Sequence, residues 1–347
     1  MIFPTSQKNR FKQMKRLQYL LAAAALLCAS ACQKAMSPDE INDLVSSGVM
    51  LVYNQYYYSV TLPSGDNIYF LGTDEDGELY GLTYDEKEAE VNARGGSGTG
   101  FFISEDGLIM TNRHVAYPQV SSDDVRRFLK GLKKGLKKVY REKMQELTQQ
   151  FYACEGDPGM QSKIAQQYSQ YETAVENIDD MDVNEADIKT HTELGILYNG
   201  EHFLKYEDLH PCTLVAYSEE PSIDLAIIQL DDATTPEGAY IFKLRDEADD
   251  KPLTFDQKLY MIGYNYGFSI ARTEQGIYSQ IYSGSVTQKS DGVRILYSIP
   301  AQHGSSGSPV VDEYGNLVAV NYAGYDNTQS FNYGIPSKKI RQFLREY

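Results

Sequence analysis

Over most of the chain, apolar residues occur in short runs separated by polar turns, which is the pattern of β-strands with a buried face. Such runs occupy about residues 48–70, 95–115, 192–230 and 251–336, and they are rich in tyrosine and β-branched residues. Clusters of proline, glycine, serine and aspartate separate the runs, as turns require. The sequence therefore predicts a body made of many short β-strands.

A different pattern occupies residues 121–180. Its apolar residues recur at helical spacing on both sides of a Gly156-Asp157-Pro158-Gly159 turn, so we expect a helical hairpin inserted into the β-body. The first arm is basic over 126–143 and the second is acidic over 172–182. Antiparallel arms would bring some of these charges together, and we interpret them as a solvated, partly matched surface. A last helix is expected at about 337–346.

Residues 1–32 have the features of a secretion signal. Five basic residues precede the apolar run Leu17–Leu27, which is too short for a stable membrane anchor, and small residues lead to Cys32. The segment resembles a bacterial lipoprotein signal, which would be cleaved before Cys32 and replaced by lipid on its thiol; ordinary signal cleavage remains open. The expected location is a bacterial cell envelope, with the lipid-anchored protein periplasmic or surface-exposed.

The chain of 347 residues carries 32 basic and 48 acidic side chains, a net charge of −16. Without residues 1–32, which hold five basic and no acidic residues, 27 basic and 48 acidic residues give −21. This charge argues against non-specific binding to nucleic acid. Of the four cysteines, Cys28 lies in the predicted signal and Cys32 is the predicted site of the lipid. The sequence leaves open whether the other two, Cys154 and Cys212, form a disulfide or stay free.

Glycines alternate at Gly96, Gly98 and Gly100, but they precede a strand. A dinucleotide-binding loop follows a strand and opens a helix, so no nucleotide site is predicted. No metal and no other cofactor is expected either.

Three residues could together carry nucleophilic catalysis. Ser306 lies in a Gly-rich turn before an apolar strand, His114 lies at the end of a strand, and Asp224 opens an apolar strand. A serine hydroxyl needs a base to take its proton, an imidazole suits that task near neutral pH, and a buried carboxylate orients the imidazole.

The segments GSGTGFFISEDGLIMTNRHVA (96–116), DLAIIQL (224–230) and QHGSSGSPVV (302–311) resemble the catalytic blocks of chymotrypsin-fold serine proteases. The bacterial HtrA/Deg branch of these trypsin-like enzymes is the most similar. GNLVAVNYAG (315–324) and NYGIPS (332–337) resemble the strands of its specificity pocket. The chain ends soon after them, so the resemblance implies no PDZ domain.

The resemblance implies a nucleophile at Ser306, a general base at His114 and an orienting acid at Asp224. Backbone N–H groups of Gly304 and Ser306 would form the oxyanion hole. The predicted pocket residues are Tyr322, Gly324 and Gly334. Ser305 and Ser308 are rival nucleophiles by residue type, but they do not lie immediately before Gly307, as the family pattern requires. No acid lies near Ile299 and Pro300, at the expected pocket base, so a small or apolar P1 residue is expected.

The resemblance implies an all-β fold of two antiparallel six-stranded barrels, with the helical hairpin in the N-terminal barrel and a C-terminal helix. The predicted segments are a signal (1–32), a tether with a β-hairpin (33–94), the N-terminal barrel (95–232, with the insert at 121–180), a linker (233–250), and the C-terminal barrel with its helix (251–347).

The expected activity is hydrolysis of peptide bonds in a protein or peptide substrate by a lipid-anchored serine endopeptidase. Two alternatives stay open. One is an exopeptidase of the dipeptidyl-peptidase kind, whose insert would block the cleft, and the other is an inactive binding lipoprotein. The insert could also mediate assembly or be an inert excursion, and the sequence does not decide whether the protein forms an oligomer.

Overall fold

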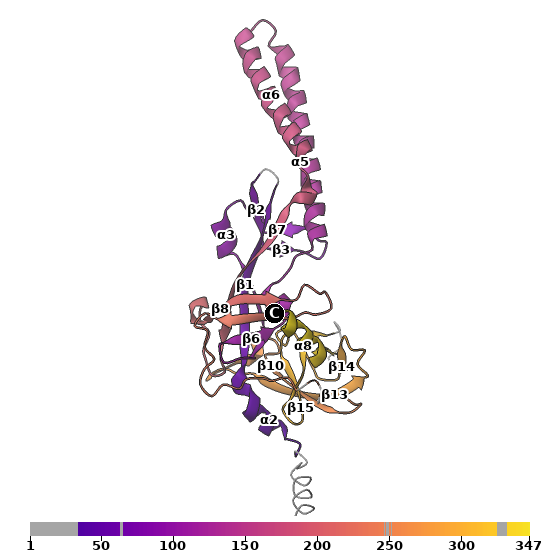
Figure 1. Ribbon diagram of the computed structural model, residues 1–347. Coiled ribbons are helices and arrows are strands. Elements are labelled where there is room, and N and C mark those ends of the chain that lie inside the picture. Colours follow the sequence, from indigo (N-terminus) through magenta and orange to yellow (C-terminus); the bar gives the residue numbers. More distant parts are fainter. Residues whose placement is uncertain (1–33, 63–64, 246, 248–249, 251, 325–331) are drawn as a thin grey trace, which may run out of the picture.

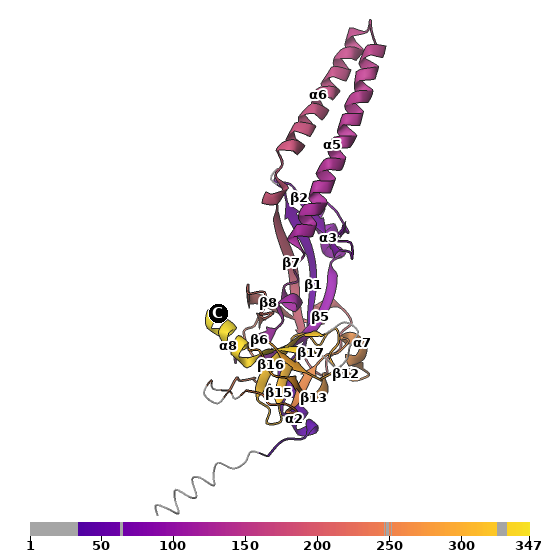
Figure 2. The ribbon, with the colours of Figure 1, turned by 90° about the vertical axis from the view of Figure 1, so that its right-hand side faces the viewer.

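A computed structural model describes residues 34–347 except 63–64, 246, 248–249, 251 and 325–331. The predicted signal, with Cys32, lies outside the described residues. Two closed β-barrels form the body, and a long projection rises from one side of it (Figures 1 and 2). No helix in the described part of the chain is long and apolar enough to cross a membrane.

The first barrel is closed by six antiparallel strands. In spatial order they are β1 (Val49–Thr61), β5 (Arg94–Phe102), β6 (Leu108–Thr111), β9 (Ala226–Leu230), β8 (His210–Tyr217) and β7 (Asp187–Leu197), and β7 pairs again with β1. Their inward-facing apolar residues fill the barrel, as the alternating pattern predicts.

The second barrel also has six antiparallel strands. Their order is β10 (Lys258–Gly263), β13 (Gln280–Gln288), β14 (Ile295–Tyr297), β17 (Asn332–Pro336), β16 (Leu317–Gly324) and β15 (Pro309–Asp312), which pairs with β10. The prediction of two six-stranded barrels, a helical insert and a C-terminal helix is confirmed, and the fold is chymotrypsin-like. The C-terminal helix is α8 (Ser337–Glu346), which packs through Ile340 and Phe343.

The barrels share one apolar core, to which both termini of the described chain contribute. Ile41 and Val45 of α2 (Pro38–Val45) and Phe343 of α8 join side chains from both barrels in a single buried cluster. A shared core of this kind gives the two barrels a defined relative orientation.

The first barrel begins earlier in the chain than the sequence predicted. β1 lies in the segment that was assigned to a tether and hairpin before residue 95, yet it pairs with β5 over 49–56 and with β7 over 51–61. The expected hairpin does exist, because β1 also pairs with β2 (Asn67–Phe70). One uninterrupted 13-residue strand therefore serves both the barrel and the hairpin, and short apolar runs could not reveal this.

The outer halves of β1 and β7 leave the barrel and carry the projection, which we call the stalk (residues 57–70 and 117–192). Its base has a small core of its own, in which Val125 and Leu129 pack against Tyr58 and Phe70. Helix α5 (Ser122–Ala153) begins in this base, and with α6 (Pro158–Asp180) it forms the predicted hairpin. In both views the two helices point away from the barrels (Figures 1 and 2).

Opposite charges meet between the two helices of the hairpin, as the sequence predicted. Lys137 forms an ion pair with Asp179, and this contact lowers the pKa of the Asp179 carboxyl. Lys133 Nζ donates to the backbone oxygens of Asp179 (2.9 Å) and Met181 (2.6 Å) at the C-terminal end of α6. These are the positions where a cation complements the helix dipole.

The remaining elements are short. They are β3 (Gly72–Thr73), β4 (Leu79–Tyr80), α3 (Glu86–Val91), α4 (Arg113–Ala116), α7 (Phe268–Ala271), β11 (Arg272–Thr273), β12 (Gly276–Ile277), and 3₁₀ turns at Ser46–Gly48, Val183–Glu185 and Tyr206–Asp208.

Both remaining cysteines are free thiols: Cys154 follows α5 in the stalk, and Cys212 lies on β8 in the first barrel. Burial raises the pKa of Cys212 to about 12, so almost none of it is thiolate at pH 8.

We expect iodoacetamide at pH 8 to alkylate the partly exposed Cys154 and to leave Cys212 unmodified until the protein is denatured. Peptide mass spectrometry measures this difference, and a Cys154–Cys212 cross-link would contradict it.

Candidate active site

His114 lies on a one-turn helix that is fastened to the first barrel. β6 ends at Thr111 and α4 follows at once. Asn54 of β1, which is 1% exposed, donates from Nδ2 to the carbonyls of Val115 (3.0 Å) and Ala116 (3.1 Å). These bonds satisfy carbonyls at the end of α4 and hold the backbone that carries His114.

Asp224 contacts His114 through both carboxylate oxygens. Its Oδ2 lies 2.5 Å from His114 Nδ1, and its Oδ1 accepts the His114 backbone N–H at 3.0 Å. The Asp224 side chain is 16% exposed, whereas that of His114 is 50% exposed. An ionised carboxylate only accepts hydrogen bonds, so Nδ1 carries the proton and Nε2 is left with its lone pair. Asn112 Nδ2 donates to the Asp224 carbonyl at 2.7 Å.

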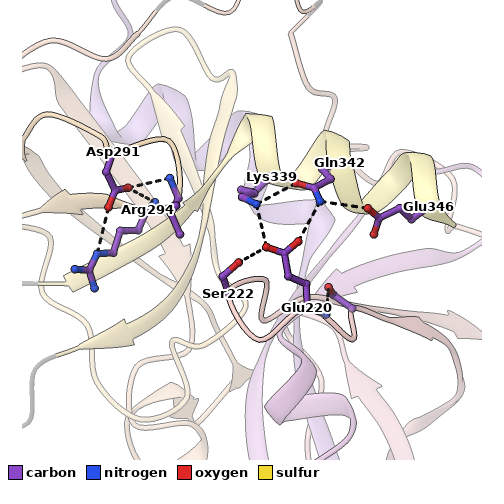
Figure 3. A network of polar contacts seen from close by, with 9 residues as sticks. Glu220, Ser222, Asp291, Arg294, Lys339, Gln342 and Glu346 are labelled. Atoms are coloured by element: carbon purple, nitrogen blue, oxygen red, sulfur yellow. Dashed lines mark hydrogen bonds and ion pairs between the residues drawn. The ribbon is translucent and has the colours of Figure 1, made fainter.

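The loop before Asp224 is tied to the C-terminal helix (Figure 3). Glu220 accepts hydrogen bonds from Ser222, from Lys339 Nζ (3.1 Å) and from Gln342 Nε2 (3.0 Å), and these contacts lower the pKa of its carboxyl. Helix α8 therefore restrains the segment that leads to Asp224.

Ser306 lies in the loop between β14 and β15 of the second barrel. Gly304 and Gly307 flank it with φ values of +90° and +87°, which residues with a Cβ rarely adopt. A Cβ on Gly307 would lie 2.1 Å from the carbonyl oxygen of Thr99 on β5. Both glycines are therefore needed for this loop shape, and Gly307 also for its close approach to the first barrel.

The neighbouring serines are poorly placed to react. Ser305 is 2% exposed, and its hydroxyl donates to the carbonyl of Gln302 at 2.6 Å. Ser308 is fully buried. Ser306, by contrast, is partly exposed and lines a cavity of about 380 Å³ together with His114 and Gly304. Within the described part of the chain, the backbone N–H groups of Gly304 and Ser306 donate no hydrogen bond.

The structure thus brings His114, Asp224, Gly304 and Ser306 together from both barrels. The other walls of the cavity come from β1, β5, the α4 region, the loop before α7 and the Ser306 loop itself, at residues Tyr56, Gly96, Ser97, Val115, Pro118, Tyr266 and His303. Tyr266 is 45% exposed and has a φ of +61°, an uncommon backbone conformation for a bulky residue. Strain of this kind concentrates at functional sites.

The predicted pocket residues lie on β16 and β17. Tyr322 is half-buried, which raises its pKa, and its ring centroid lies 6.5 Å from that of Tyr333. Gly324 ends β16, next to residues outside the described part. Gly334 is buried in the second barrel, where a Cβ would lie 2.9 Å from Tyr297 Cε1. A role for these three residues in substrate binding remains a prediction.

Sequence reasoning missed the buried amides that hold the site. Asn54 and Asn112 are examples, and Asn321 on β16 is a third, with Nδ2 donating to the carbonyl of Ser305 at 3.0 Å. Asn321 interrupts an apolar strand, as does Asn54, and a polar residue in such a run is a detectable signal. Only the fold shows which backbone groups they reach. The described residues contain no cluster of three or more side chains suited to a metal ion.

The two barrels define a chymotrypsin-like fold, and residues of both barrels line the cavity that holds Ser306 and His114. Residues 185–320 match the family model described as a trypsin-like peptidase domain, and the protein is a serine protease, a peptide-bond hydrolase. The matched range contains Asp224 and Ser306, while His114 precedes it, beyond the helical hairpin. No curated protein matches the chain.

We expect Gly304→Ala to disturb the loop around Ser306. The new Cβ would lie 2.3 Å from the Tyr264 carbonyl oxygen at a φ of +90°, a strain of about 1–3 kcal/mol. The melting temperature should fall, and fluorophosphonate labelling should slow by about tenfold or more. Gly131→Ala is the matched control, because its Cβ meets no atom within 4 Å; it should stabilise α5 by roughly 0.5–1 kcal/mol and leave labelling unchanged. Equal labelling of both variants would contradict the role of Gly304.

Proposed function

We propose that the protein is a serine endopeptidase of the HtrA-like type, with Ser306 as nucleophile, His114 as general base and Asp224 as the acid that orients it. One observation carries the proposal. The Asp224 carboxylate lies 2.5 Å from His114 Nδ1, and His114 shares a cavity with Ser306. This arrangement leaves Nε2 as the nitrogen that can take a proton.

The reaction follows from these roles. Ser306 Oγ attacks the peptide carbonyl carbon while its proton passes to His114 Nε2, and the carbonyl oxygen becomes an oxyanion. The N–H groups of Gly304 and Ser306, which donate to no acceptor among the described residues, would donate hydrogen bonds to that oxyanion and stabilise its charge. The C–N bond then breaks as Nε2 returns the proton to the leaving amine. Water attacks the acyl-enzyme in the same way and releases the acid.

The position of the helical hairpin favours an endopeptidase over an exopeptidase. The alternative required the insert to block the cleft, but α5 and α6 point away from the barrels (Figures 1 and 2).

At the expected base of the specificity pocket, Asn332 and Asn265 donate amide N–H groups to the carbonyls of Ile299 and Pro300. Neutral amides there favour small or apolar P1 residues over basic ones.

Ser306→Ala should abolish both fluorophosphonate labelling and cleavage of an unfolded protein such as casein, because no other nucleophile faces His114 in the proposed mechanism. Asp224→Asn should lower kcat by about 10⁴-fold, since the amide favours the wrong imidazole tautomer. Labelling and peptidase assays of the mature protein measure both effects.

Ser308→Ala is the control, because that hydroxyl is buried and the variant should remain labelled. Labelling that survives Ser306→Ala would refute the assignment. A peptide blocked at its N-terminus separates the alternatives, since an endopeptidase cleaves it and a dipeptidyl peptidase does not. An inactive binding protein would neither label nor cleave.

We further propose that the enzyme acts outside the cytoplasm, anchored through lipid on Cys32. The proposal rests on the pattern of residues 1–32 and on the negative charge of the remaining chain. One lipid chain binds a membrane only marginally, so stable anchoring needs more than one.

Cys32→Ser should therefore move the protein from the membrane fraction to the soluble fraction of a bacterial host. Mass spectrometry of the wild-type N-terminus should find a lipid-modified cysteine. Cys154→Ser should leave the distribution unchanged, and a wild-type protein cleaved elsewhere and recovered without lipid would contradict the anchor.

A further inference from the structure

The loop that carries Ser306 is held largely through its carbonyl groups. The carbonyl of His303 accepts the backbone N–H of Tyr266 at 2.5 Å. The carbonyl of Gly304 accepts Thr99 Oγ1 at 2.8 Å, and that of Ser306 accepts the Thr99 backbone N–H at 2.8 Å. Three carbonyl groups of this loop are thus held by donors from Thr99 and Tyr266.

Fixing a carbonyl also fixes the N–H group of the next residue. In a trans peptide group the C=O and N–H bonds lie in one plane and point in opposite directions. A bond to the His303 carbonyl therefore turns the Gly304 N–H the other way, and a bond to the Ser305 carbonyl does the same for the Ser306 N–H. Neither of these two N–H groups has an acceptor in the described part of the chain, and both residues line the cavity.

Asn321 supplies the bond to the Ser305 carbonyl. This side chain is 2% exposed, and its Nδ2 donates to Ser305 O at 3.0 Å and to Ser305 Oγ at 3.1 Å. A carbonyl oxygen only accepts, so the amide must turn its nitrogen toward Ser305. Its Oδ1 then accepts the hydroxyl of Tyr297 at 2.7 Å. Tyr297 is fully buried, and burial raises the pKa of its phenol well above the usual value, so the hydroxyl stays a donor.

We propose that Asn321, oriented by Tyr297, is a positioning residue that keeps the Ser306 N–H directed into the cavity, ready for the oxyanion. The inference rests on the proposed function of Ser306. Without the amide, the Ser305–Ser306 peptide group can rotate and bring a carbonyl dipole toward the developing negative charge. The N–H of Ser308 also donates to Ser305 O, at 3.0 Å, so part of the restraint survives the loss of Asn321.

The decisive variant is Asn321→Asp, which keeps the shape of the side chain but replaces the donor with an acceptor. We expect the acylation rate with p-nitrophenyl acetate, and kcat with a peptide, to fall by about 10–100-fold, because a partly misdirected donor costs less than a deleted one. KM should stay within about twofold, since the donor acts on the transition state. Tyr297→Phe keeps the ring and should lower kcat by a smaller factor, about 3–10-fold.

The pH dependence of acylation separates this role from damage to the rest of the site. It should be unchanged in Tyr297→Phe, because this variant adds no charge and leaves the contact between Asp224 and His114 intact. Asn316→Ala is the matched control: it removes side-chain hydrogen bonds to Asp312 in the turn between β15 and β16 and should leave kcat at the wild-type value. If Asn321→Asp does not fold, Tyr297→Phe decides by the same criteria.

A folded Asn321→Asp with wild-type kcat, or a loss confined to KM, would overturn the inference while leaving Ser306 as the nucleophile. A wild-type protein that is not acylated at Ser306 would instead refute the proposed function. The two failures are therefore distinguishable in one set of measurements.

Discussion

The site depends on hydrogen bonds between the two barrels, and Thr99 makes three of them. This buried residue of β5 donates its backbone N–H to the Ser306 carbonyl and its hydroxyl to the Gly304 carbonyl, and its hydroxyl also accepts the Tyr264 N–H at 3.1 Å. Its own carbonyl accepts Thr111 Oγ1 at 2.7 Å, one strand away, at the end of β6 that leads to His114. Through its side chain and its two peptide groups, Thr99 thus fixes the position of the Ser306 loop relative to the barrel that carries His114.

The stalk is structurally separable from this arrangement, although it grows from the same strands. One half of β1 and of β7 belongs to the barrel, and the other half extends beyond it. There Val125 and Leu129 pack in a separate, smaller core. Farther along the stalk, α5 and α6 contact each other through the Lys137–Asp179 ion pair and the rings of Tyr140 and Tyr171, and no residue of either helix belongs to the cores of the barrels. A long insertion is therefore tolerated next to the α4 turn, because its contacts are local.

The fold class could be predicted, and the three candidate residues could be selected from the sequence, because their signals are local. A Gly-Ser turn, a histidine after a strand and an acid opening an apolar strand are patterns of a few residues, and the hairpin has a helical period. The extent of β1 could not be predicted, because the residues that pair with this strand lie up to 146 residues away in sequence, as Leu197 of β7 does from Leu51. Gly334 illustrates a second limit. A glycine that resembles a pocket residue is packed against Tyr297, and only the packed structure shows that contact.

A buried amide holds the backbone next to each candidate residue. Asn54 supports α4, Asn112 supports Asp224, and Asn321 supports Ser305. The Oδ1 atoms of Asn54 and Asn112 are buried and accept no hydrogen bond from the described residues, which costs about 1–3 kcal/mol for each group. These unpartnered oxygens lower the stability of the folded protein. In return, a neutral amide holds the backbone in place without adding a charge near His114. The field at that imidazole is then set mainly by the one carboxylate that touches it, which is the condition an orienting acid needs.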